Sequence, residues 1–97
     1  TAAGAVYLQG NDAVVLNNAA NIAVTVATTP KPGDLLTAIC LNTNNGTTLT
    51  LPSGVTWDGT NRIATFDADG EYLIVRAIST ARRFVIHNTS SVAFSNP

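Results

Sequence analysis

The stretch from residue 35 to residue 51 constrains the fold most, because two β-type runs flank one turn within it. Residues 35–42 are mostly apolar, and in residues 48–51 Thr alternates with Leu, so Leu49 and Leu51 share one face. Between the runs, Asn44-Asn45-Gly46 tolerates the positive φ that tight hairpin turns need. The pattern predicts a β-hairpin on which the later strands pack.

Seven more short segments read as strands, each bounded by turn residues such as Gly, Pro or Asn. They are residues 6–9, 13–16, 22–28, 62–66, 72–78, 82–87 and 92–94. Residues 72–78 are almost continuously apolar, which predicts a central strand buried on both faces. The prolines in residues 29–34 predict a crossover loop between sheets. The whole pattern predicts one all-β domain over residues 1–97: an antiparallel β-sandwich or jelly-roll-like barrel of about eight or nine short strands.

Alternation within these strands predicts the side chains of the core. The expected core residues are Leu36, Ile39, Leu49, Leu51, Ile63, Leu73, Val75, Phe84 and Ile86. Trp57 is expected to plug one end of the sandwich. The small face of Ala23, Thr25 and Ala27 is expected to pack between copies of the chain.

Charge and cysteine content exclude several classes of function. Charged residues make up 11% of the chain and the net charge is −1, which is too little positive charge for a nucleic-acid binder. No segment approaches the length of a membrane span. Cys40 is the only cysteine, so no internal disulfide or cysteine-based zinc site can form, and we expect it to be a small buried hydrophobe. A first residue of Thr1 fits either removal of an initiator methionine or a processed fragment.

No motif in the sequence names a reaction. His87 is the only histidine, no Gly-x-Ser-x-Gly elbow occurs, and the sequence does not place any two of the six acids across a cleft. The turn around Asp67 and Asp69 resembles a calcium loop only superficially, since further oxygen ligands are missing. We therefore expect no catalytic residue, no metal and no cofactor, and predict that the chain is not an enzyme.

One cationic cluster is left, and two interpretations of it stay open. Arg76, Arg82, Arg83 and His87 fall in the last predicted strands. They form either a solvated or interface face, or a contact with an anion or an acidic partner.

Residues 32 to 95 resemble small β-domains of tailed-bacteriophage virion proteins. The resemblance rests on a Pro-Gly-Asp start, a Leu-Pro-Ser-Gly-Val edge, an Asp-Gly-Thr-Asn loop, a late aromatic strand and a short closing strand, at residues 32–34, 51–55, 58–61, 82–87 and 92–95. Such domains serve as head decoration (cement) proteins or as tips of fibres and spikes, and the family implies trimers in both cases.

The resemblance leads to two hypotheses for function. The first is a cement protein, made in the bacterial host cytoplasm, that binds the outer surface of a phage head as a homotrimer and contacts the major capsid protein. Its expected capsid contacts are an N-terminal arm of residues 1–9 that orders on docking, above all Thr1, Ala2, Ala3 and Gly4, and the arginines Arg76, Arg82 and Arg83. The alternative is the receptor-binding tip of a tail fibre or spike, with exposed Trp57 and Tyr72 as contacts. A third interpretation, a carbohydrate-binding module, would need two or three coplanar aromatic side chains.

Overall fold

The computed structural model describes residues 4–7, 11–28, 31–42, 46–57, 60–78, 84–89 and 92–96, with residues 84–89 described by their backbone alone. Within these ranges the chain forms nine strands and no helix. The strands are β1 (Gly4–Val6), β2 (Asp12–Asn17), β3 (Ala23–Val26), β4 (Leu35–Asn42), β5 (Thr47–Thr50), β6 (Ile63–Phe66), β7 (Tyr72–Ala77), β8 (Phe84–Thr89) and β9 (Ala93–Ser95).

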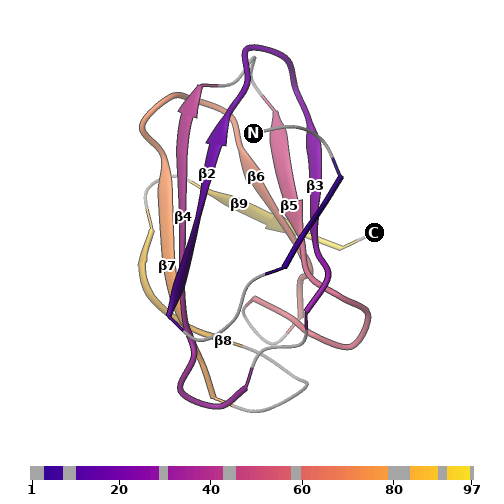
Figure 1. Cartoon of the computed structure of the whole chain (residues 1–97), viewed down its shortest axis with the longest axis vertical. Coiled ribbons are helices and arrows are strands. Elements are labelled where there is room, and N and C mark those ends of the chain that lie inside the picture. The colour runs from indigo at the N-terminus through magenta and orange to yellow at the C-terminus, as the bar shows by residue number, and fades with distance from the viewer. Residues whose placement is uncertain are drawn as a thin grey trace.

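The strands form two sheets that pack face to face (Figure 1). Sheet A has five strands in the order β1-β3-β5-β6-β9, and sheet B has four in the order β2-β4-β7-β8. The predicted all-β sandwich is therefore confirmed, and each predicted strand overlaps or adjoins an observed one.

The sheets are mixed, so the predicted antiparallel pairing holds for only part of the sandwich. β1 pairs with β3, β3 with β5 and β2 with β4 in parallel, whereas the four later pairs are antiparallel. The reason is that every connection from β1 to β5 crosses from one sheet to the other, so each strand lies beside the strand two before it. Residues 4–50 wind as a coil of two sheets, and the later strands close it.

The predicted hairpin of residues 35–51 is also wrong. β4 lies in sheet B, between β2 and β7, and β5 lies in sheet A, between β3 and β6. Asn44 and Asn45 of the predicted turn lie outside the described residues. Buried Leu36 and Leu49 show why the two arms separate: each arm turns its apolar face toward the other across the core.

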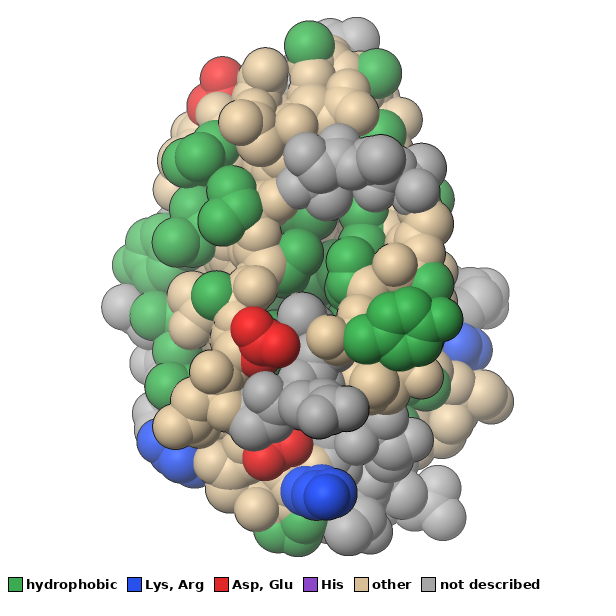
Figure 2. Space-filling model, viewed as in Figure 1, with side chains coloured by type: hydrophobic (Ala, Val, Ile, Leu, Met, Phe, Trp, Pro, Cys, Tyr) green, Lys and Arg blue, Asp and Glu red, His purple; other side chains and the backbone are tan. Residues whose placement is uncertain are grey.

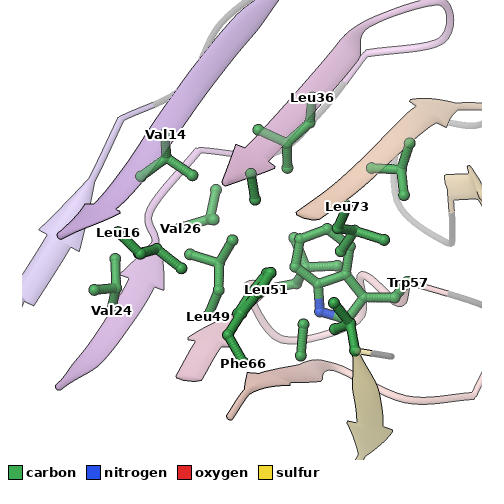
Figure 3. Packing of buried hydrophobic residues seen from close by; sticks show 14 of the residues in the cluster. Val14, Leu16, Val24, Val26, Leu36, Leu49, Leu51, Trp57, Phe66 and Leu73 are labelled. Atoms are coloured by element: carbon green, nitrogen blue, oxygen red, sulfur yellow. The ribbon is translucent and has the colours of Figure 1, made fainter. Parts of the chain in front are cut away.

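The core lies between the sheets and takes side chains from both of them (Figure 3). Five of the predicted core residues are confirmed as buried: Leu36, Leu49, Leu51, Leu73 and Val75. Ile39 and Ile63 are only half-buried, so these two predictions are wrong. The side chains of Phe84 and Ile86 lie outside the described part of the structure.

The two wrong assignments follow from the alternation of side chains along a strand. In β4 the inward positions are Leu36, Ala38 and Cys40, which leaves Ile39 on the other face. In β6 the inward positions are Ala64 and Phe66, and each is fully buried. Isoleucine is larger than the neighbouring alanine in each strand, which favours it as a core residue by size. A small inward residue makes room for a large neighbour, as Ala38 does beside its register partner Leu73.

The loop between β3 and β4 crosses from sheet A to sheet B, as predicted. The backbone N–H of Gly33 donates to the carbonyl of Ala77 at 2.8 Å, and the N–H of Ala77 donates to the carbonyl of Asp34 at 2.8 Å. Gly33 has a φ of 91°, a conformation that favours glycine. The loop is thereby fixed against the end of β7.

Candidate functional site: the outer faces of the two sheets

Sheet B carries large apolar side chains on the side that faces away from the core. Inward positions of its strands hold the core residues, so the positions between them point outward. Val15, Ile39 and Tyr72 are register partners and form a row across three strands. We call the outward apolar set of sheet B the apolar face: Val15, Leu35, Ile39, Leu41, Tyr72, Ile74 and Ile78.

Three residues of the apolar face are exposed in the single chain, and the other four are half-buried. Leu41 is 54% exposed, and Val15 and Ile78 are each 44% exposed. The register between β2 and β4 shifts beside Leu41, which marks a β-bulge. Figure 2 shows hydrophobic side chains gathered along the left flank of the molecule, where β2, β4 and β7 lie. Exposed patches of this kind mark interaction sites in other proteins.

The prediction that residues 72–78 are buried on both faces is wrong. β7 is central in sheet B, between β4 and β8, and its inward residues are buried. Its outward residues Tyr72 and Ile74 are half-buried, while Arg76 and the following Ile78 are exposed. The sequence correctly indicated that residues 72–78 have two mostly apolar faces, because the apolar run is almost continuous. The described part of the single chain covers only one of them.

The outer face of sheet A is of a different kind. Ala23, Thr25 and Ala27 are exposed, and the register places Thr48 beside Ala23 and Thr50 beside Thr25. Small and hydroxyl side chains thus alternate with the buried residues, which is the usual pattern of a face open to water. Packing of this face between copies stays a prediction.

The N-terminal segment is part of the sandwich from Gly4 onward. Residues 4–6 form β1, which pairs in parallel with β3, and the N–H of Ala27 donates to the carbonyl of Val6 at 2.8 Å. The expectation that the arm of residues 1–9 orders only on docking is therefore wrong for Gly4–Val6. Thr1, Ala2 and Ala3 lie outside the described residues.

The structure places one of the three predicted capsid-contact arginines. Arg76 is exposed on the outer side of sheet B, opposite Leu35 in the register, and its Nη1 donates to the carbonyl of Gly33 at 2.9 Å. Arg82 and Arg83 and the side chain of His87 lie outside the described part of the chain. Arg76 lies between Ile74 and Ile78 of the apolar face, level with the start of β4.

The two aromatic residues of the fibre-tip hypothesis have different surroundings. Trp57 is fully buried, so its expected exposure is wrong, and its indole Nε1–H donates to the carbonyl of Arg62 at 2.8 Å. The role as an apolar plug, which the sequence predicted, agrees with this burial. Tyr72 is half-buried in the apolar face.

The turn between β6 and β7 holds a buried carboxylate. Glu71 is 6% exposed, and its Oε1 accepts the N–H of Asp67 at 2.7 Å and that of Ala68 at 3.4 Å. Burial raises the pKa of the Glu71 carboxyl, the hydrogen bond from the Asp67 N–H opposes the change, and the neighbouring Asp67 side chain raises the pKa further. In the described residues, no group of three or more His, Cys, Asp and Glu side chains could hold a metal ion.

Cys40 lies under the same turn. Its side chain is fully buried, as predicted, and its carbonyl accepts the N–H of Gly70 at 2.7 Å. Burial raises the pKa of the Cys40 thiol, and the negative charge of Asp69 raises it further. Because the thiolate is the reactive form, this environment makes Cys40 a packing residue.

Comparison with known proteins assigns no family to the chain: no protein-family model matches it, and no curated protein matches it significantly. Among the described residues there is also no helix with the length and apolarity to cross a membrane.

Proposed function

We propose that the chain is a structural virion protein, a decoration protein that cements the outer surface of a phage head. The observation that carries the proposal is the apolar face of sheet B, which is partly exposed in the single chain and suits the packing of copies into an oligomer, on a domain of low charge. The resemblance of residues 32–95 to virion β-domains supports the phage head as the place where the chain acts. In this proposal the chain forms a homotrimer, is made in the host cytoplasm and contacts the major capsid protein.

The proposed mechanism is stabilisation by mass action. A protein that binds the expanded shell, and neither free nor unexpanded capsid subunits, shifts the equilibrium toward the expanded shell. At a free concentration of the protein a hundred times its dissociation constant, binding would stabilise the expanded shell by about 2.7 kcal/mol per site. No bond is made or broken, so the proposal needs no catalytic residue.

The fibre-tip hypothesis has less support. It relied on two exposed aromatic side chains, and Trp57 is fully buried. Tyr72 belongs to the apolar face and is half-buried.

The test is binding to purified shells. The protein is mixed with expanded empty phage heads, with unexpanded heads and with intact host cells, and each is sedimented. Co-sedimentation with expanded heads, together with a higher melting temperature of those heads, is the expected result. Binding to cells without binding to heads would overturn the proposal in favour of the fibre tip, and binding to none of the three would overturn both.

A further inference from the structure

We propose that a second copy of this chain covers the apolar face, so that copies associate through the outer side of sheet B. The inference rests on the proposed function for the premise that the chain self-assembles, and it names the surface. It differs from the sequence-based prediction, which places the contact between copies on the small face around Thr25.

The outer faces of the two sheets differ in the size and polarity of their side chains. In β3 and β5 the outward residues Thr25, Thr48 and Thr50 alternate with buried valine and leucine, as in strands with one wet face. The outward residues of β4 and β7 are mostly large and apolar, as in strands covered on both sides. The same sequence thus carries one face suited to water and one suited to a protein contact.

The size of the face fits the centre of a contact between copies. The face spans the three strands β2, β4 and β7, two of which have six residues. At about 4.8 Å between strands and about 3.3 Å per residue, it measures roughly 14 by 20 Å, or about 280 Å². A standard interface removes about 800 Å² per partner. The face therefore fits the buried centre of a contact, and the polar residues around it, such as Asn17 and Asn42, fit the rim.

The charge of the face also suits a second copy. Among the described side chains of this side of the sheet, Arg76 is the only charged one, and it lies between Ile74 and Ile78, opposite Leu35. Its side chain is exposed and donates to the carbonyl of Gly33, before the start of β4, so its charge can stay solvated when two faces pack together. The surface of an unrelated protein is only partly apolar, whereas a second copy offers the same apolar face at the same concentration.

The experiment compares lysine substitutions on the two outer faces. Leu41→Lys and Ile78→Lys, made separately, place a charge in the proposed contact. Thr25→Lys is the matched control on the outer face of sheet A. All three positions are exposed, so each variant is expected to keep the wild-type circular dichroism spectrum. Molar mass is measured for the full chain, free of phage heads, by light scattering over a range of micromolar concentrations.

The wild type and Thr25→Lys are expected to form the same oligomer, with three copies under the proposed function. For each folded apolar-face variant the dissociation constant should rise at least about tenfold, because burying an unpaired charge costs more than 1.4 kcal/mol. A monomeric wild type, or an oligomer that only Thr25→Lys weakens, would overturn the inference.

Head binding is scored separately, which keeps the two proposals distinguishable. A protein that oligomerises through the apolar face and fails to bind heads supports the inference and contradicts the cement function. A monomer that binds heads supports head binding and contradicts the inference that copies associate through the apolar face. A dimer would support the face and contradict the three-fold stoichiometry.

Discussion

The indole Nε1–H of Trp57 and the backbone N–H of Leu51 both donate to the carbonyl oxygen of Arg62, at 2.8 and 3.0 Å. The Nη2 of the Arg62 side chain in turn donates to the carbonyl of Leu51 at 3.1 Å. This group of bonds closes the loop between β5 and β6 and draws its aromatic residue into the core. The tryptophan is thereby a structural part of the sandwich.

Trp57→Phe should lower the free energy of unfolding by roughly 1–3 kcal/mol, because it removes one hydrogen bond and leaves a space in the core. Urea denaturation followed by circular dichroism measures the change. Thr25→Ala, at an exposed position, is the control and should stay within about 0.5 kcal/mol of the wild type. Equal stability of Trp57→Phe and the wild type would contradict the packing seen here.

Leu73→Ala should cost roughly 2–5 kcal/mol of stability, since the side chain is fully buried between the sheets. Ile78→Ala, just beyond the same strand and 44% exposed, should cost less than about 1 kcal/mol. The pair is compared by denaturant titration at a concentration where both are monomeric. Phe84→Ala is predicted from the sequence to resemble Leu73→Ala.

Cys40 should not react with a thiol reagent in the native protein. Its side chain is fully buried, and burial and nearby negative charge raise the pKa of the thiol. Labelling with a disulfide reagent should be slow in buffer and should accelerate as denaturant unfolds the domain. Fast labelling without denaturant would show that the turn over Cys40 opens readily.

Glu71 should make stability depend on pH. Because the folded pKa of Glu71 is raised, its protonated form is favoured in the folded state. The stability that the raised pKa of Glu71 contributes is therefore fully present below the unfolded pKa of about 4.3. This stability is lost as pH rises through the folded pKa of Glu71. Glu71→Gln keeps an oxygen acceptor and removes the charge, so its stability relative to the wild type should be highest at neutral pH. Denaturant titrations at several pH values test this, and a constant difference would contradict it.

Deleting residues 1–6 should destabilise the free domain by at least about 1 kcal/mol, because β1 and its hydrogen bonds to β3 are lost. Deleting residues 1–3 is the control that leaves β1 in place. Thermal melting compares the two truncations with the full chain. If both melt like the full chain, β1 contributes nothing to the sandwich.

The sequence predicted the nine strands and the sandwich well, because alternation and turn residues are local signals. It failed where a decision depended on the partner of a strand. Asn45-Gly46 indicates a reversal of the chain, but it does not say whether the two arms meet in one sheet or cross to two. Ile39 was misassigned for a related reason, since size and apolarity do not reveal which face of a strand is covered.

The candidate surface was partly visible in the sequence. The apolar run of residues 72–78 gave the signal of two covered faces, and the error was to assume that the chain itself covers both. The burial of Trp57 was expected as a plug, yet the fibre-tip hypothesis needed it exposed. The fold was required to decide between the two.

The coil of residues 4–50 has a consequence for how the chain acquires its structure. Each strand in it pairs with the strand two before it, as Val24 does with Gly4 and later with Leu49, so no two neighbouring strands of this half can begin as a local hairpin. Loops of twenty or so residues must close before the first ladders form, and such closure slows folding. The antiparallel pairs β5–β6 and β7–β8 are the local ones, and we expect them to nucleate. The ribosome must therefore have released all of residues 4–50 before the three parallel ladders of this half can be complete.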